Sequence, residues 1–296
     1  MIRNLCVSLA LLTLPASAMA QLGVEDALEY LNRAESARAV SILQPLAARG
    51  DVLAQYNLGV LALGAQAGMS ADDADLWLGK AAQSGYLPAQ TALADLMVDR
   101  HDWTQAAQWY LMAAQAGDLT AQFMSGLILD QGLAGAPDPQ AAAQWYELAA
   151  QQGHKQAQFA LGSLLTEQGQ PEQAAPWFEH AALQGHVAAQ FELARALATG
   201  QGLAQDAGAA RGWYLRAAHA GSGPAMHNLA LMQARGQGGR SSYRLALAWA
   251  LNAQGAGHDS AQDLIAALRD VMPPEAQSDA EALAQSCLAA LSDDCN

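Results

Sequence analysis

The sequence has little charge, few aromatic residues and almost no cysteine. Charged residues make up 14% of the 296 residues, against about 25% in an ordinary soluble domain, so much of the surface must consist of Gln, Ala, Ser and Gly. Basic residues are scarcest: 14 Lys and Arg stand against 28 Asp and Glu, a net charge of −14. Nucleic-acid binding and attraction to anionic lipid both need a basic surface, so these two classes of function are excluded.

Beyond its first residues the chain also lacks an apolar run of about 18 residues, so no membrane span is predicted there. The N-terminus has the pattern of a signal peptide, with Arg3, the apolar stretch 5–14 and the A-x-A sequence that ends at Ala20. We therefore expect residues 1–20 to be removed and the mature chain to begin at Gln21. The protein would then be periplasmic or secreted, without membrane insertion after cleavage; an uncleaved N-terminal helix is the alternative.

The chain contains three cysteines, of which Cys6 lies in the predicted signal peptide. Cys287 and Cys295 remain as one pair in an oxidising compartment. On an unbroken helix these two residues would lie about 12 Å apart, whereas a disulfide requires Cα atoms within about 7 Å. We therefore predict that the last helix ends near Leu291 and that a turn over 292–294 brings the cysteines together. Two free thiols are the alternative.

What the chain does contain is an internal repeat. A tryptophan, an aromatic residue, two alanines, a glycine and an Ala-Gln pair recur in register. The repeated tryptophans are spaced 32, 36, 32, 36 and 36 residues apart: Trp77, Trp109, Trp145, Trp177, Trp213 and Trp249. The repeated glycines include Gly85, Gly117, Gly153, Gly185 and Gly221, with looser copies at Gly50 and Gly257. The alternation of spacings indicates a fixed repeat with an optional insertion of four residues.

Each repeat is predicted to form two helices. Apolar residues recur at helical spacing in 105–116 and again in 120–130, and Gly117 lies where a helix C-cap needs a left-handed residue. Small residues at one position of the second helix would let the facing helix approach closely: Gly59, Ala94, Gly126, Gly162, Ala194 and Ala230. Because one such hairpin cannot bury its own apolar face, the pattern predicts an all-α fold, a right-handed α-solenoid of about seven stacked αα-hairpins.

This pattern resembles the Sel-1-like repeat, a relative of the tetratricopeptide repeat, over roughly residues 36–268. The segment from Pro45 to Gly59 is similar to the first repeat of many bacterial members. The resemblance implies an adaptor or signalling scaffold rather than one catalytic activity. The flanking segments 21–35 and 269–296 are expected to be N- and C-terminal capping helices, since a solenoid needs polar outer faces at its ends.

The repeated tryptophans are predicted to be structural core, each filling the same inter-helix site, rather than a surface on which a ligand stacks. The repeated glycines are assigned to the same structural pattern. Trp103 is not one of the repeated tryptophans; it lies in the connection 99–104 and is a candidate contact residue.

No catalytic or metal-binding arrangement is evident. His154, His186 and His258 each follow a turn glycine, so whole repeats of roughly 10 Å separate them, too far to share one ion. The glycine-rich stretch 236–239 has no strand before it, and no Gly-x-Ser-x-Gly elbow is present. We therefore expect no catalytic residue, no metal, no other cofactor and no enzymatic activity. Relatives associated with β-lactams carry a cysteine pair in each repeat, which this chain lacks.

The surface remains as the candidate for function. The first helix of each repeat is expected to line a groove in which polar side chains could hydrogen-bond a peptide; the alternative for each residue is an ordinary solvated position. The candidate partner-binding residues are Gln108, Gln115, Gln144, Glu147, Gln151, Arg211, Arg216 and Trp103. We expect a periplasmic scaffold or regulator that binds an envelope protein, whose identity and stoichiometry the sequence does not encode. The alternatives are a β-lactam-interacting or other small-molecule-binding protein, and a secreted factor that binds host proteins.

Overall fold

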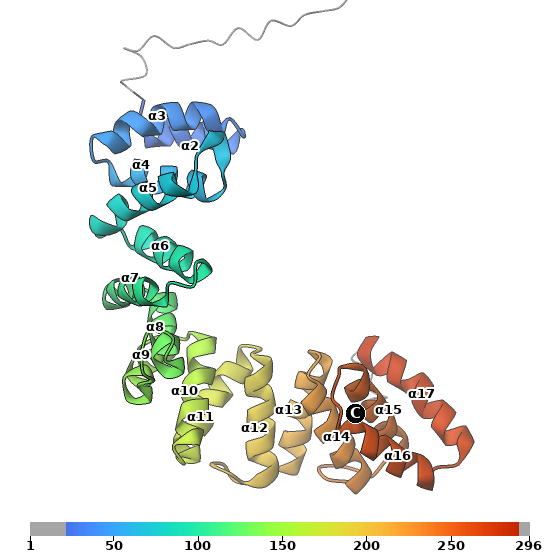
Figure 1. Ribbon diagram of the computed structural model, residues 1–296. Coiled ribbons are helices and arrows are strands. Elements are labelled where there is room, and N and C mark those ends of the chain that lie inside the picture. Colours follow the sequence, from blue (N-terminus) through green and yellow to red (C-terminus); the bar gives the residue numbers. More distant parts are fainter. Residues whose placement is uncertain (1–21, 290–296) are drawn as a thin grey trace, which may run out of the picture. The chain divides into compact units, whose positions relative to one another are not determined.

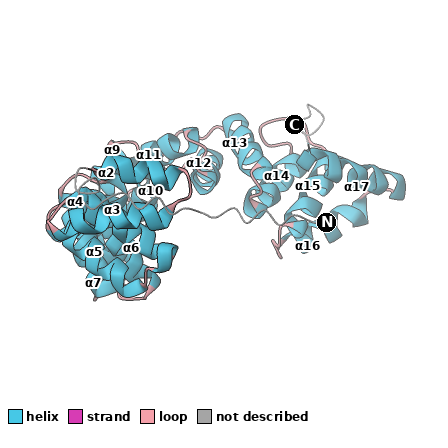
Figure 2. Cartoon of the chain, turned by 90° about the horizontal axis from the view of Figure 1, so that it is seen from above, coloured by secondary structure: helices cyan, strands magenta, loops and turns pink. Residues whose placement is uncertain are grey.

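The computed structural model describes residues 22–289, and the regular elements in that range are helices (Figures 1 and 2). They begin with α2 (Val24–Asn32) and end with α17 (Pro274–Ala289). None of the helices in this range is long and apolar enough to cross a membrane. The predicted all-α fold is confirmed, whereas the predicted signal peptide, residues 1–20, lies outside the described residues.

The helices between α2 and α17 alternate as the first and second members of consecutive hairpins. The first helices are α3 (Ser36–Ala48), α5 (Ala71–Gln83), α7 (Trp103–Gln115), α9 (Pro139–Gln151), α11 (Pro171–Leu183), α13 (Ala207–His219) and α15 (Tyr243–Gly255). The second helices are α4 (Val52–Leu63), α6 (Leu87–Asp99), α8 (Leu119–Gln131), α10 (Lys155–Glu167), α12 (Val187–Thr199), α14 (Gly223–Arg235) and α16 (Ala261–Val271). One 3-10 turn, η1 (Gln66–Gly68), follows α4.

The chain divides into two compact units. The first extends to residue 121 and includes 133–135, and the second contains 122–132 and the chain from 136 onward. In the first unit α4 packs against both α3 and α5, and α6 packs against both α5 and α7. In the second unit α10 packs in the same way between α9 and α11, and α12 between α11 and α13 (Figure 1). Each of these second helices therefore joins its own hairpin to the next one within its unit, which is solenoid packing.

Each hairpin turns at the repeated glycine. Gly117 has a φ of 94°, its N–H donates to the carbonyl of Ala114, and the N–H of Asp118 donates to the carbonyl of Ala113. This pair of bonds satisfies two carbonyls at the end of α7 and requires a left-handed residue, as predicted. The other repeated glycines also have positive φ: Gly50, Gly85, Gly153, Gly185, Gly221 and Gly257.

The alternation in repeat length arises between hairpins. Three residues join α6 to α7 (100–102) and α10 to α11 (168–170), whereas seven join α8 to α9 (132–138) and α12 to α13 (200–206). The longer loop 200–206 folds back over its own repeat, because a Cβ on Gly202 would lie 2.2 Å from the carbonyl oxygen of Pro171 at the start of α11. Gly202 also has a φ of 76°. Both the close contact and the left-handed backbone therefore require glycine at this position.

The contact between consecutive hairpins places a small residue against a large one. A Cβ added to Gly126 would lie 2.6 Å from the ring of Tyr146, and one on Gly162 would lie 2.7 Å from the ring of Phe178. The predicted close approach at this position of the second helix is therefore confirmed. At the equivalent alanines of α6, α12 and α14 the side chains are fully buried: Ala94, Ala194 and Ala230.

The residue after each repeated tryptophan forms the buried core. Tyr146 is fully buried and Phe178 is 4% exposed, and Tyr110 and Tyr214 are similarly enclosed. In contrast, Trp77, Trp109, Trp145, Trp177 and Trp213 are only half-buried. The prediction that each tryptophan fills a buried inter-helix site is confirmed for Trp249, which is fully buried. The other five are not fully enclosed, although Trp77, Trp177 and Trp213 do pack against the buried cores. The tryptophans lie at the edge of the interface, while the next residue points into the preceding second helix.

The repeated Ala-Gln pair ties the two helices of a hairpin together. Nε2 of Gln158, which is buried, donates to the carbonyl of Ala150 at 3.1 Å, so a side chain of α10 satisfies a carbonyl in the last turn of α9. The same bond recurs in three other hairpins, from Gln55 to Ala47, Gln90 to Ala82 and Gln190 to Ala182. The sequence marked these glutamines as a pattern but did not reveal their role.

At the C-terminal end, α17 packs on α15. Nδ2 of Asn252 in α15 donates to the carbonyl of Ala284 in α17 at 3.0 Å, and Cys287 is fully buried in the same core as Trp249. The predicted bond from Cys287 to Cys295 stays a prediction, because Cys295 and the predicted turn lie outside the described residues.

Candidate binding surface on the second helices

Most of the predicted groove residues are solvent-exposed on the first helices: Gln108, Gln115, Gln144, Glu147, Gln151 and Arg216. Several interact within their own helix. Nε2 of Gln151 donates to Oε1 of Glu147 at 3.1 Å, and the guanidinium of Arg216 lies 4.5 Å from the centre of the Trp213 ring. None of these residues lines the two pockets described below.

Arg211 and Trp103 differ from the prediction. The half-buried Arg211 lies against the loop between α14 and α15, where a Cβ on Gly239 would be 2.2 Å from Nη1, and burial lowers its pKa. Trp103 is not in a connection but is the first residue of α7, because Asp102 caps that helix by accepting the N–H of Gln105 at 3.0 Å. Arg211 therefore lies on a first helix, as predicted, but is partly covered by a loop, and Trp103 lies in a helix rather than in a connection.

The second helices present half-exposed rings at one repeated position. Each ring contacts the residue that follows the turn glycine of the next hairpin. Ring centres are 5.1 Å apart for Tyr56–Tyr86, 5.1 Å for Phe123–His154, 4.6 Å for Phe159–His186 and 4.9 Å for His227–His258. These rings were not singled out from the sequence, although their regular distance from the turn glycines could have identified them.

The repeated histidines cap the second helices. Nδ1 of His154 accepts the N–H of Ala157, and Nδ1 of His186 accepts that of Ala189, both at 3.2 Å. An imidazole that accepts at Nδ1 is neutral and carries its proton on Nε2. Burial and the nearby charge of Lys155 lower the pKa of His186, which favours the same form. Other hairpins have an oxygen in this role, from Asp51, Asp118 and Ser222.

Within residues 22–289 no group of three or more His, Cys, Asp or Glu side chains is arranged to hold a metal ion. Helix capping accounts for the repeated position of His154 and His186, whereas His258 contacts the ring of His227.

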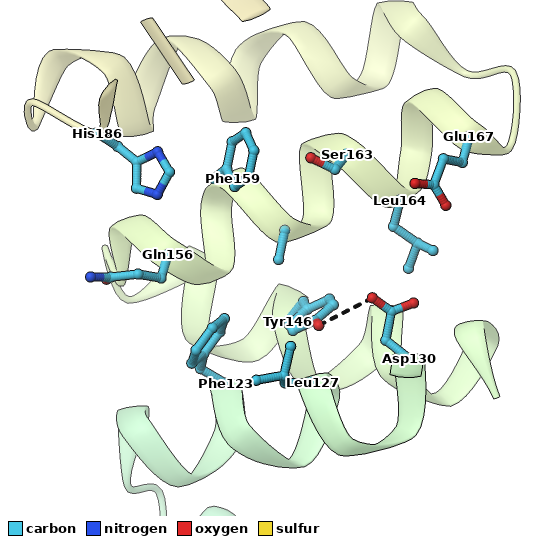
Figure 3. A pocket seen from close by; sticks show the side chains of 11 residues that line it. Phe123, Leu127, Asp130, Tyr146, Gln156, Phe159, Ser163, Leu164, Glu167 and His186 are labelled. Carbon is cyan, nitrogen blue, oxygen red and sulfur yellow. Dashed lines mark hydrogen bonds between the residues drawn. The ribbon is translucent and has the colours of Figure 1, made fainter. Parts of the chain in front are cut away.

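In the second unit a pocket of about 300 Å³ lies on this surface, lined by α8, α9 and α10 (Figure 3). Its apolar lining includes Phe123, Leu127, Phe159 and Leu164. The carboxylates of Asp130 and Glu167 lie at one end, and Gln156 and His186 lie at the other (Figure 3). The pocket therefore combines an apolar middle with an acidic end and a neutral polar end.

The acidic end is held in place by Tyr146. The hydroxyl of Tyr146 donates to Oδ2 of Asp130 at 3.3 Å, and burial together with the charge of Asp130 raises the pKa of Tyr146. The tyrosine is therefore a neutral donor. The half-buried Asp130 carboxylate can accept further bonds, and Glu167 is exposed beside it.

The first unit contains a pocket of different character, about 460 Å³ in volume, which includes Leu93, Met97 and Trp109. Its cation is already paired, because Nη1 of Arg100 lies 2.8 and 2.9 Å from the two oxygens of Asp75. A ligand there would compete with an ion pair, whereas the residues that line the pocket on α10 include two carboxylates and no lysine or arginine.

The chain belongs to the Sel1 repeat family. The Sel1 repeat model matches more than half of the chain, over residues 52–75, 89–118, 119–154, 155–186, 187–222 and 223–253. Such repeats mediate interactions between proteins.

Two solved structures resemble the chain. One is c5321, a protective antigen present in uropathogenic Escherichia coli strains, at 26% identity and a TM-score of 0.55, with 88% of this chain and 66% of that chain covered. The other is a Sel1 repeat protein from Oxalobacter formigenes, at 22% identity and a TM-score of 0.52, with 91% and 97% covered. This chain thus spans just under two thirds of the antigen. No curated protein sequence is significantly similar to it.

Proposed function

We propose that the mature chain is a non-enzymatic scaffold or regulator in the periplasm, which binds a protein of the cell envelope. The observation that carries this proposal is the row of half-exposed rings on the second helices, together with the pocket on α8 to α10. Apolar anchors with polar groups around them are what a partner segment needs for affinity and orientation.

The same face of α4 in the first unit is strongly apolar. Leu53, Val60 and Leu63 are 47%, 42% and 45% exposed and recur along one helix. Large apolar side chains clustered on a surface are typical of a site for another protein. Large apolar side chains are exposed on the first helices as well, for example Leu111 and Leu148, so the choice of the second helices as the proposed partner-binding surface rests on the rings and the pocket.

The proposal of export is supported by the N-terminal sequence pattern that ends at Ala20. Intact-mass analysis of a periplasmic extract should find a chain that begins at Gln21. Full-length chain recovered from the cytosol would contradict export, and release into the medium would favour the secreted alternative.

Partner binding is tested by a photo-crosslinking residue placed in turn at Ser163, in the pocket, and at Gln144, on the exposed face of α9. In periplasmic extract the Ser163 position should crosslink one defined protein, which mass spectrometry then identifies. The Gln144 position is the matched control and should give a much weaker product. A product only at Gln144 would restore the first helices as the binding surface, and none at either position would contradict the scaffold function.

A further inference from the structure

One position that lines the pocket on α10 carries a guanidinium group in the next hairpin. Arg195 on α12 occupies the same repeat position as Ser163 on α10, nine residues after the capping histidine in each case. Nε of Arg195 donates to Oε2 of Glu192 at 2.8 Å, and Nη1 donates to Oε1 of Gln201 at 3.1 Å. At this position α12 therefore has an arginine held by a carboxylate.

On α10 the position of Arg195 is taken by Ser163 and that of Glu192 by Ala160, and the carboxylates that line the pocket come from other repeat positions. Ser163 is small, and the acidic end of the pocket beside it is formed by Asp130 and Glu167. Of these, Asp130 is half-buried and fixed by Tyr146, so its orientation is set before any ligand arrives. A planar guanidinium with several donors matches such carboxylates better than a compact ammonium.

The middle of the pocket suits the stem of an arginine. Phe123 and Phe159 are half-buried, so each leaves part of a ring uncovered, and methylene groups can pack on these surfaces. A guanidinium near an aromatic face gains further attraction. At the other end the neutral His186, whose proton is on Nε2, can donate to a backbone carbonyl and does not repel the cation.

We propose that this pocket binds an arginine side chain from an extended segment of the partner protein, with the guanidinium on Asp130 and Glu167 and the stem over Phe123 and Phe159. The inference rests on the proposed scaffold function and specifies the chemistry that the partner presents. It is consistent with the acidity of the whole chain, in which 28 acidic residues oppose 14 basic ones, because that excess draws basic segments to the surface.

The test uses the full mature chain and two fluorescein-labelled peptides, Ala-Leu-Arg-Leu-Ala and the same peptide with citrulline in place of arginine. Citrulline has the shape of arginine without the charge. Fluorescence anisotropy at near-physiological salt should show the arginine peptide binding at least about tenfold more tightly, as expected for charge-assisted hydrogen bonds.

The double variant Asp130→Asn with Glu167→Gln should remove this preference. The new amide oxygen at position 130 would still accept the Tyr146 hydroxyl, and a thermal melt verifies folding. The matched control is Glu172→Gln with Glu179→Gln, two exposed positions on α11 that change the net charge equally. A third variant, Ser163→Arg, places a guanidinium group at the pocket itself and should block it while both carboxylates remain.

Equal binding of the two peptides by the unmodified chain would overturn the inference. An equal loss of the preference in the α11 control would also overturn it, because it would indicate attraction to net charge alone. A dimer detected by sedimentation and abolished by the Asp130 and Glu167 changes would overturn it as well, because the occupant would then be a second copy of the chain. The peptide preference is measured without the partner. A captured partner with no arginine preference therefore refutes only this inference, and an arginine preference with no captured partner refutes only the scaffold proposal.

Discussion

Helices α9 and α15 carry the same tryptophan position in different surroundings. Trp145 on α9 is half-buried, and the following Tyr146 fills the core; Trp249 on α15 is fully buried, and the following residue is the small Ala250. Helix α15 packs against α14 and also against α17, so that Leu245 and Ala248 are buried with it. The repeated tryptophan is thus a core residue only where a further helix covers it.

The largest expected effect is on these two tryptophans. Trp249→Ala should lower the free energy of unfolding by about 3–5 kcal/mol, because a large side chain is removed from a closed core. Trp145→Ala should cost only about 1–2 kcal/mol, since part of that ring is already in solvent. Urea denaturation of the two variants gives both values, and the transition of Trp249→Ala should broaden as the last hairpins uncouple.

Tyr146→Ala is the matched control for the second tryptophan. It should cost more than Trp145→Ala although it removes a smaller ring, because Tyr146 is fully buried. Equal losses for Trp145→Ala and Trp249→Ala would contradict the comparison and restore the sequence-based assignment of one uniform core column.

The sequence was sufficient for the fold because spacing alone fixes helices, turn glycines and small contact residues. It could not choose between Trp145 and Tyr146, because both lie on the apolar side of α9 and only the position of α8 decides which one is enclosed. For the same reason no sequence signal indicated that the rings of Phe123 and Phe159 would remain partly exposed. The polar groove was assigned to the first helices because their glutamines stand out in sequence, whereas an exposed apolar position does not.

Capping was missed for a similar reason. A histidine after a turn glycine has no distinctive sequence signal until the geometry places Nδ1 of His186 3.2 Å from the N–H of Ala189. Likewise, Asp102 was not recognised as the cap that places Trp103 inside α7. Both cases depend on local atomic contacts rather than on periodicity.

The next largest expected effect on stability concerns the predicted disulfide of α17, the helix that packs on α15. Formation of the predicted Cys287–Cys295 bond should stabilise the chain by about 2–3 kcal/mol in the chain-entropy model. Thiol counting on denatured, unreduced protein should find no free thiol. Reductant should then lower the free energy of unfolding. The decrease should be smaller in Trp249→Ala if α17 no longer packs on α15 in that variant.

Cys295→Ala should reproduce the effect of reductant, whereas Cys287→Ala should cost more because Cys287 is also fully buried. Two free thiols in the monomer, or an interchain bond, would refute the predicted pairing.

A smaller effect, an increase in stability, is expected from a substitution on α14, which also packs against α15. Gln233 on α14 is fully buried, and neither its Nε2 nor its Oε1 has a hydrogen-bond partner within the described residues. The equivalent residues of four other hairpins are apolar: Met97, Leu129, Leu165 and Leu197. Because an unsatisfied buried amide is costly, Gln233→Leu should raise the free energy of unfolding by about 1–2 kcal/mol.

Gln158→Leu is the same substitution at a buried glutamine that does have a partner, the carbonyl of Ala150. It should destabilise the chain, and thermal melts of the two variants make the contrast visible. A loss of stability in both would show that Gln233 has an unrecognised bonding role.

The smallest expected effect is on the pH dependence of stability. It should differ between α12, which is capped by His186, and α14, which is capped by Ser222. The folded state lowers the pKa of His186 below its ordinary value near 6.5, so the unfolded chain binds the proton more readily. The stability from this cap is therefore complete above about pH 6.5 and declines as the pH falls through that value toward the lower folded pKa. Loss of one cap is worth about 1 kcal/mol.

His186→Asp should retain a capped α12, as Asp51 and Asp118 do for their own helices. It removes the Phe159–His186 ring contact, so we expect little net change in stability at pH 7.5 but a shallower decline between pH 7 and pH 5, where an aspartate remains ionised. Ser222→Asp is the control, because it adds the same cap where no histidine is replaced and should leave the slope unchanged. Urea denaturation at both ends of this range measures the slope. Should the His186→Asp chain lose as much stability on acidification as the unmodified chain, the pH dependence would arise outside the α12 cap.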